Sequence, residues 1–210
     1  MKPWLIFGAG GNGVGACVLE LALAGGHPVV ALVRKPDAAQ RLRDMGVTVI
    51  EGDASDPHAV EQACLTAGES AAIISTLGGS QDYLAHRIIV DTAEKCGLSQ
   101  MVMVTSLGCG DSWPTLSLRA RAAFGQAVRE KSLAEIWLQT SSLDFAIVRP
   151  GGLLNGTATG LAQLYQHQEV HGFVYRSDVA KVVQQLLAGA ALNNQTYSLV
   201  QPELTPATNQ

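Results

Sequence analysis

Strong basic character and long apolar runs are both missing from this sequence. No cluster of lysine and arginine is larger than the pair Arg34–Lys35, and the net charge is −4. A dedicated nucleic-acid-binding protein depends on a basic face, so we expect no nucleic-acid partner. No apolar stretch approaches the roughly 20 residues that span a bilayer. Since the first residues lead directly into a predicted strand, we expect no signal peptide. Together with the lack of a membrane-spanning stretch, this predicts a cytoplasmic protein with no membrane partner.

Cysteine is scarce, and no residues are grouped in a metal-binding pattern. The four cysteines are scattered and form no C-x-x-C pair: Cys17, Cys64, Cys96 and Cys109. This distribution argues against a disulfide framework and fits a reducing compartment. His167 and His171 are four residues apart, but no third ligand accompanies them, so we predict no metal site. Cys109 has no partnered histidine, and we do not expect it to act as a nucleophile.

Apolar runs and helical patterns alternate regularly along the chain. The predicted strands are Pro3–Gly8, Pro28–Arg34, Val47–Glu51, Ala71–Thr76, Met101–Ser106, Asp144–Arg149 and Thr196–Val200. The predicted helices are Gly13–Ala24, Asp37–Met45, Pro57–Ala67, Tyr83–Lys95, Leu118–Thr140 and Ser177–Ala188. Runs such as "VVALV" and "MVMV" are typical of strands buried on both faces. The order predicts an α/β protein with a doubly wound parallel sheet. We expect one domain over residues 1–201 and a polar tail over 202–210.

The stretch "GAGGNGVG" follows the first predicted strand and opens the first predicted helix. It fits the pattern G-x-G-x-x-G at Gly8, Gly10 and Gly13. In a Rossmann fold the first glycine permits a tight turn, the second lets the backbone approach a pyrophosphate, and the third lets helix and strand pack closely. The helix N-terminus then faces the phosphates. We therefore predict a dinucleotide site that includes this loop, with Gly11, Asn12 and Val14.

The end of the second predicted strand indicates which dinucleotide is bound. An NAD site usually has Asp or Glu there for the ribose 2′-hydroxyl, whereas an arginine suits a 2′-phosphate. This sequence has Arg34 and Lys35 at that place. The guanidinium of Arg34 offers a planar fork for a phosphate, and Lys35 adds charge. The sequence therefore predicts NADP(H) rather than NAD(H).

These motifs resemble the short-chain dehydrogenase/reductase superfamily, in its atypical, NAD(P)H-binding (NmrA-like) branch, over nearly the whole chain. Within the branch, "SLGCGDSWP" and "LAEIWLQTSSLDFAIVRPGGL" are similar to biliverdin-reductase-B/flavin-reductase-like proteins. The loop departs from the usual G-A-x-G-x-x-G: Gly8, Ala9 and Gly11 match, but the third glycine falls at Val14, between Gly13 and Gly15. The resemblance implies further cofactor-binding residues in four segments: Asp53 and Ala54 beside the adenine, Thr76, Leu77 and Gly78 under the cofactor, Ser106 at the usual catalytic serine, and Pro150, Gly151, Gly152 and Leu153 against the nicotinamide.

The acid that the superfamily normally uses is absent. That acid is the tyrosine of Y-x-x-x-K, and aligning Lys131 with its lysine puts Ala127 at the tyrosine position. Reduction of an unactivated ketone needs a proton donor near the developing alkoxide. An acceptor that delocalises the charge of the hydride, such as a flavin or a linear tetrapyrrole, can take its proton from water. Lys131 is expected either to bind the ribose or to be a solvated helix residue.

The carboxyl-terminal part is short, which limits the substrate site. We expect loops 107–116 and 151–175 to form a shallow pocket for a planar, conjugated small molecule. Trp113 is expected either to stack on the substrate or to cap the core, Ser106 to position the substrate or the nicotinamide, and Asp111 to form a turn or relay a proton. The leading hypothesis is an NADPH-dependent reductase, either monomeric or weakly dimeric. A non-catalytic NADP(H) sensor is the alternative, and an isomerising or dehydrating enzyme a weaker third.

Overall fold

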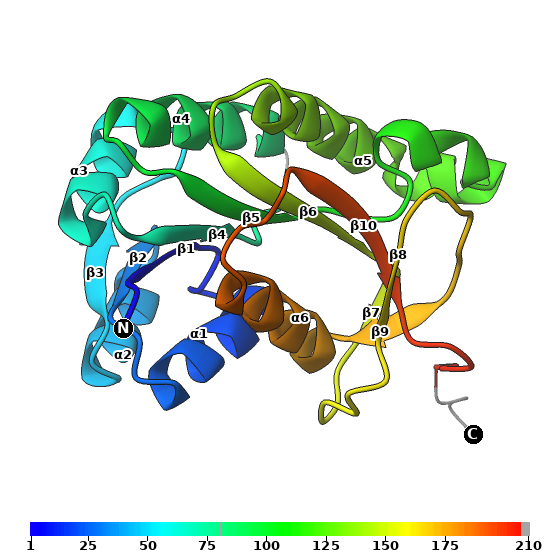
Figure 1. Ribbon diagram of the computed structural model, residues 1–210, viewed down its shortest axis with the longest axis horizontal. Helices are drawn as coiled ribbons and strands as arrows, with labels where there is room; N and C mark the ends of the chain where they lie inside the picture. Colours follow the sequence, from blue (N-terminus) through cyan, green and yellow to red (C-terminus); the bar gives the residue numbers. More distant parts are fainter. Residues whose placement is uncertain (80, 207–210) are drawn as a thin grey trace.

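A central, mostly parallel sheet organises the chain (Figure 1). The computed structural model describes residues 1–79 and 81–206. The sheet has eight strands in the order β3-β2-β1-β4-β5-β6-β10-β8, and only the edge strand β8 runs antiparallel to its neighbour. The order reverses at β1, because the chain moves outward to β3 and then returns to add β4 on the other side. This is the doubly wound topology that the sequence predicts.

The strands of the sheet follow the apolar runs closely. They are β1 (Trp4–Phe7), β2 (Val29–Val33), β3 (Thr48–Glu51), β4 (Ala72–Ser75), β5 (Gln100–Val104), β6 (Asp144–Pro150), β10 (Gln195–Val200) and β8 (Gln163–Tyr165). Every residue of β1, β2 and β4 is buried. The continuous apolar runs therefore correspond to strands covered on both faces.

The helices are α1 (Val14–Ala24), α2 (Pro36–Asp44), α3 (Pro57–Ala67), α4 (Asp82–Lys95), α5 (Leu118–Gln139) and α6 (Arg176–Ala188). The start of α3 is confirmed: Asp56 accepts a hydrogen bond from the His58 backbone, and Pro57 occupies the first helical position. Helix α6 begins one residue before the predicted start at Ser177, and its N-cap residue is Tyr175. Asp178 instead accepts hydrogen bonds from the Thr159 and Gly160 backbones.

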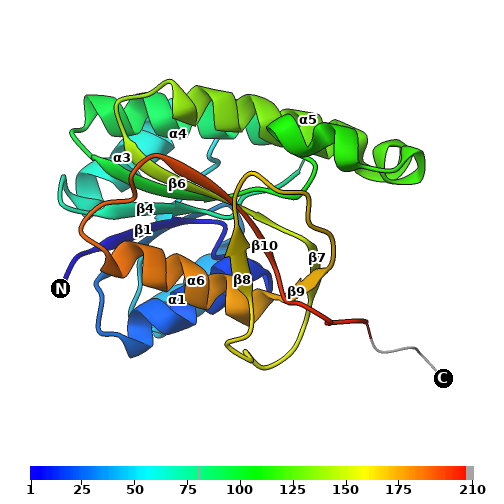
Figure 2. The same cartoon turned by 45° about the vertical axis from the view of Figure 1, so that its right-hand side comes forward.

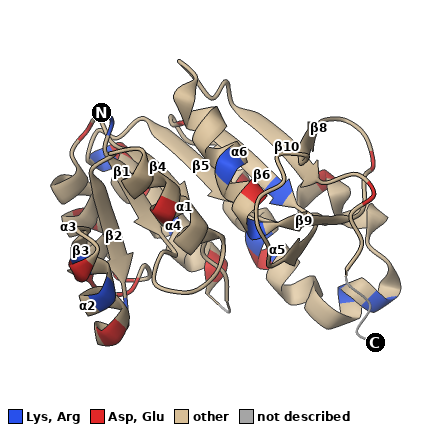
Figure 3. Cartoon of the chain, turned by 90° about the horizontal axis from the view of Figure 1, so that it is seen from below, with Lys and Arg blue, Asp and Glu red and all other residues tan. Residues whose placement is uncertain are grey.

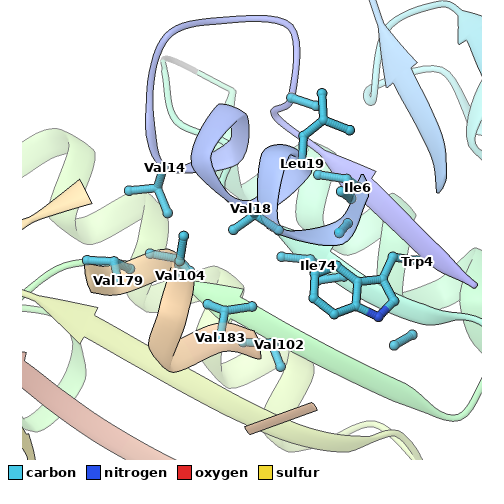
Figure 4. Packing of buried hydrophobic residues seen from close by; sticks show 14 of the residues in the cluster. Trp4, Ile6, Val14, Val18, Leu19, Ile74, Val102, Val104, Val179 and Val183 are labelled. Atoms are coloured by element: carbon cyan, nitrogen blue, oxygen red, sulfur yellow. The ribbon is translucent and has the colours of Figure 1, made fainter. Parts of the chain in front are cut away.

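Two helical layers cover the sheet (Figures 1 and 2). Helices α3, α4 and α5 lie on one face, and α1, α2 and α6 lie on the other. Figure 4 shows how the second layer packs: Val14 and Val18 of α1 and Val179 and Val183 of α6 meet the strand residues, among them Ile6. Because β1 to β6 and β10 run parallel, their carboxyl ends lie at the same edge of the sheet.

Three short strands and a turn of 3₁₀ helix lie in segments that were predicted as loops. Strands β7 (Gly152–Leu154) and β9 (Phe173–Tyr175) form a small parallel pair, and β8 adds to the main sheet. The 3₁₀ helix η1 (Gly110–Thr115) precedes α5. Residues 202–206 continue from β10, and positions 207–210 of the predicted tail lie outside the described residues.

Charged segments of both signs are interspersed along the fold (Figure 3). In the part of the chain that the structure describes, no helix has the length and apolar character needed to cross a bilayer.

Candidate dinucleotide-binding site

A cavity of about 410 Å³ opens at the carboxyl ends of β1, β2 and β4. This is the point where the strand order reverses, which is where open α/β sheets bind ligands. The predicted cofactor residues that line it are Gly8, Gly10, Gly11, Arg34, Lys35, Asp53, Ala54, Leu77 and Gly78. Thus the glycine loop, the end of β2 and the segments after β3 and β4 come together around one cavity.

The glycines of the loop have different structural roles from those assigned by the pattern. Gly8 has φ +102°, and a Cβ there would collide with the side chain of Thr76. A Cβ at Gly15 would collide with the Gly8 carbonyl and lie 2.6 Å from Thr76 Oγ1. A Cβ at Gly13 would meet no described atom within 4 Å, and Gly13 precedes α1 as its N-cap. The close helix–strand contact predicted for Gly13 is therefore made by Gly15.

Basic side chains surround the mouth of the cavity. Arg34 Nη1 lies 3.4 Å from Asp53 Oδ2; the Arg34 side chain is largely exposed and that of Asp53 is half-buried. Hydrogen bonds from the backbone and hydroxyl of Ser55 lower the pKa of Asp53, with a smaller contribution from Arg34. Arg41, which the sequence analysis missed, donates a hydrogen bond to the Gly10 carbonyl at 3.0 Å. The feature of the sequence that could have indicated this contact is the position of Arg41 in the last turn of the helix that follows Arg34.

A buried polar cluster borders the cavity, and its central residue Asp82 is part of the lining. Lys131 Nζ donates to the Leu77 carbonyl at 2.7 Å and pairs with Asp82 Oδ2, also at 2.7 Å. His86 Nδ1 lies 2.8 Å from the other Asp82 oxygen, and His86 Nε2 lies 2.7 Å from Ser75 Oγ. Burial alone would raise the pKa of Asp82, but His86 and Lys131 outweigh it and lower the pKa. Lys131 is therefore not a solvated helix residue.

The sequence analysis missed Asp82, His86 and Ser75. The Asp82–His86 spacing of four residues at the start of α4 was a usable signal, because it puts both side chains on one helix face. Ala127, at the position of the absent tyrosine, is exposed one turn before Lys131.

The remaining predicted cofactor residues lie outside the lining of this cavity: Asn12, Gly13, Val14, Thr76, Ser106, Pro150, Gly151, Gly152 and Leu153. Ser106 follows β5 and donates to its neighbouring Leu107 carbonyl at 3.0 Å. The Gly151 and Gly152 backbones donate to the carbonyls of Leu199 and Gly172. The roles predicted for these residues toward the cofactor remain predictions.

A second cavity of about 690 Å³ is lined by both segments predicted to form the substrate pocket. Its lining includes Leu107 and Asp111 from the first segment and His167 from the second. Trp113 does not line it. The central guanidinium carbons of Arg121 and Arg129 instead lie over the Trp113 ring, 5.2 and 5.3 Å from its centroid. For Trp113 to stack on a substrate, the substrate would therefore have to reach the side of η1 where Arg121 and Arg129 lie.

Cys109 is fully buried near this second cavity. Burial raises the pKa of its thiol to about 12, and the neighbouring Glu135 adds to the effect. A thiol with so high a pKa is a poor nucleophile at neutral pH, which agrees with the sequence-based expectation.

Comparisons with known proteins agree with the dinucleotide site. A family model described as NAD(P)H-binding matches residues 8–189. The structure of ChuY, described as an anaerobillin reductase from Escherichia coli O157:H7, is 64% identical, with a TM-score of 0.97, and the match covers 98% of this chain and 100% of that one. YhfK of Bacillus subtilis, described as an uncharacterized sugar epimerase, is 27% identical over 193 residues, 83% of each protein.

A more distant structure supports the fold alone. A short-chain dehydrogenase/reductase from Veillonella parvula in complex with NADP is 20% identical, with a TM-score of 0.76, and the match covers 99% of this chain and 100% of that one. The match to the family model extends from the glycine loop to the end of α6. This chain therefore belongs to the NAD(P)H-binding family.

Proposed function

We propose that this protein is an NADPH-dependent reductase that transfers a hydride to a linear tetrapyrrole or a similar conjugated molecule. The observation that carries the proposal is the 64% identity, over nearly the whole chain, to a protein described as an anaerobillin reductase. The cavity at the strand switch point supplies a place for the dinucleotide. We also propose that the protein acts in the cytoplasm as a monomer or weak dimer.

The preference for NADPH rests on the mouth of the cavity. Arg34 is exposed there, and its partner Asp53 is 3.4 Å away, so the guanidinium is free to reorient toward a 2′-phosphate. Lys35 also lines the cavity and adds positive charge. A bidentate contact between arginine and phosphate would favour NADPH over NADH.

The residues of the chain act mainly by positioning. A bound NADPH supplies the hydride, and solvent supplies the proton, because position 127 holds alanine. Lys131 already donates to Leu77 and Asp82. Its proposed role is to hold the segment after β4 under the cofactor. A conjugated acceptor spreads the added charge over its own π-system, so orientation of two rings is the main requirement.

The test is NADPH oxidation, followed by its absorbance, with biliverdin, FMN and riboflavin as acceptors. We expect oxidation above the background without enzyme, fastest with the tetrapyrrole, and slower oxidation of NADH. Tight NADPH binding without oxidation by any acceptor would contradict the reductase and favour the sensor. If flavins alone are reduced, the tetrapyrrole part of the proposal fails.

A further inference from the structure

A buried ionic network joins the carboxyl ends of β5 and β6 to α5. Arg149 of β6 donates through Nε to Glu135 Oε1 at 3.0 Å and through Nη2 to Glu135 Oε2 at 2.7 Å. Thr105, which follows β5, donates its hydroxyl to Glu135 Oε1 at 2.6 Å. The side chains of Glu135 and Arg149 are 1% and 7% exposed. Such a two-pronged pair fixes both groups in position.

Asp111 is the member of the network that reaches the surface. Its carboxylate pairs with Nη1 of Arg149, while 85% of its side chain is exposed. The hydrogen bond from Arg149 lowers the pKa of Asp111, so the carboxylate is charged at neutral pH. Asp111 belongs to η1, and its pair with Arg149 connects this 3₁₀ helix to the sheet.

Two further attachments of η1 lead to α5, and Ser112 Oγ accepts a hydrogen bond from the Gly108 backbone in the loop before η1. The Gly110 backbone donates to Ser132 Oγ at 3.0 Å, and Arg121 donates to the Trp113 carbonyl at 3.2 Å. Among the hydrogen bonds of the described residues, the bond to Asp111 is the one that joins a side chain of η1 to the sheet. Without it, η1 would keep its bonds to α5 and to the loop before it, but none of its described side chains would be bonded to the sheet.

The network adjoins the residues predicted to face the nicotinamide. Thr105 directly precedes Ser106, and Arg149 directly precedes Pro150. The Leu107 backbone donates to the Pro150 carbonyl at 3.0 Å, which joins the two segments beyond the network. Residues Gly110–Ser112 also line the cavity of about 690 Å³. A shift of η1 would therefore change the wall of that cavity next to these segments.

Stability alone does not account for this network. A buried ion pair is often no more stabilising than apolar side chains of the same volume, because both charges lose their hydration. Its specific effect is to fix geometry, and here the fixed parts are the ends of two central strands and η1. Catalysis by orientation is sensitive to displacements of about 1 Å.

We propose that Asp111 is a positioning residue for the reductase: through Arg149 it holds η1 against the ends of β5 and β6 and so shapes the site that receives the hydride acceptor. The proposal rests on the proposed function. Asp111 does not line the cavity at the strand switch point, so its effect is on the acceptor and not on dinucleotide affinity.

Asp111→Asn is the test, because it removes the charge and keeps the size of the side chain. We expect KM for the acceptor to rise about fivefold, the effect of losing one partly exposed ion pair, with the dissociation constant of NADPH unchanged. Asp111→Glu, which keeps a carboxylate, should recover part of the loss. Glu61→Gln, a neutralised exposed carboxylate on α3, is the control and should behave as wild type. An unchanged KM in Asp111→Asn would overturn the proposal.

A second readout follows η1 directly. Trp113 lies on η1, whereas Trp4 and Trp137 lie on β1 and α5. In protein labelled with 5-fluorotryptophan, Asp111→Asn should shift or broaden the ¹⁹F resonance of Trp113, assigned with Trp113→Phe, and leave that of Trp4 in place. A lower melting temperature with an unmoved Trp113 resonance would mean a merely structural role and overturn the proposal. If wild-type protein reduces no acceptor, the proposed function fails, and this resonance alone decides whether Asp111 holds η1.

Discussion

At the scale of single residues, the glycine loop shows that similar glycines meet different constraints. Gly8 needs its positive φ, and Gly15 lies against the Gly8 carbonyl, so neither position has room for a side chain. A Cβ at Gly11 or Gly13 would meet no described atom within 4 Å. The fold therefore requires glycine at Gly8 and Gly15. At Gly11 and Gly13, the free space instead lets a ligand come close to the backbone of the loop.

The contrast between Gly15 and Gly13 predicts different costs for the same substitution. Gly15→Ala places a methyl group against the Gly8 carbonyl and Thr76 and should lower the free energy of unfolding by about 1–3 kcal/mol. Gly13→Ala, two residues away, should lower it by less, about 0.5–1 kcal/mol, because alanine is a poorer N-cap residue than glycine. Urea unfolding followed by circular dichroism measures both. Equal losses in the two variants would contradict the assignment of the close contact to Gly15.

At the scale of secondary-structure elements, the pair between Asp82 and Lys131 joins the start of α4 to the middle of α5. Asp82 is 1% exposed, so it depends on its partners to remain charged. The same lysine holds the Leu77 carbonyl. Packing of the two helices is thereby linked to the segment after β4 that lines the cavity at the strand switch point.

Lys131→Met should destabilise the protein by about 3 kcal/mol near neutral pH, because it leaves a buried carboxylate with one partner fewer. The pKa of Asp82 is lowered in the folded protein. Its stabilising contribution is therefore present above the unfolded pKa of about 3.9 and lost as the pH falls through the folded pKa. The difference between variant and wild type should therefore persist from pH 7 to about 4 and shrink as the pH is lowered further, through the folded pKa of Asp82. Urea unfolding across this range measures it, and a difference independent of pH would contradict the argument.

Elements with local signals could be predicted from the sequence. Helix α3 was predicted to the residue, because Asp56 and Pro57 mark its start within the chain itself. Strand β7 was not predicted: it has three residues, and its pairing partner β9 is about 20 residues away. Short strands of this kind depend on tertiary contacts more than on local pattern.

The candidate site divides in the same way. Arg34 and Asp53 were predicted because each follows a strand in a recognisable motif. Arg41 and the Asp82–Lys131 pair were not, because their contacts depend on how α2, α4 and α5 lie beside the loops. The close packing at Gly15 likewise could not be predicted, because it depends on where the fold places Thr76.

At the scale of the whole molecule, the cavity at the strand switch point is built from segments after four different strands. Gly10 follows β1, Arg34 follows β2, Asp53 follows β3, and Gly78 follows β4. A ligand there contacts parts of the chain that come together only in the folded state. Binding should therefore stabilise the entire domain by mass action.

The size and specificity of this stabilisation can be predicted. At a concentration of 100 times its dissociation constant, NADPH should add about 2.7 kcal/mol, which for a domain of this size corresponds to about 5–10 °C in melting temperature. NADH at the same concentration should give a smaller shift, because it has no 2′-phosphate for Arg34 to bind. Arg34→Ala should reduce the NADPH shift to that of NADH, whereas Arg43→Ala should not, because Arg43 pairs with Glu51 and does not line the cavity. Differential scanning fluorimetry measures all three proteins, and equal shifts by the two nucleotides in wild type would exclude the proposed preference for NADPH.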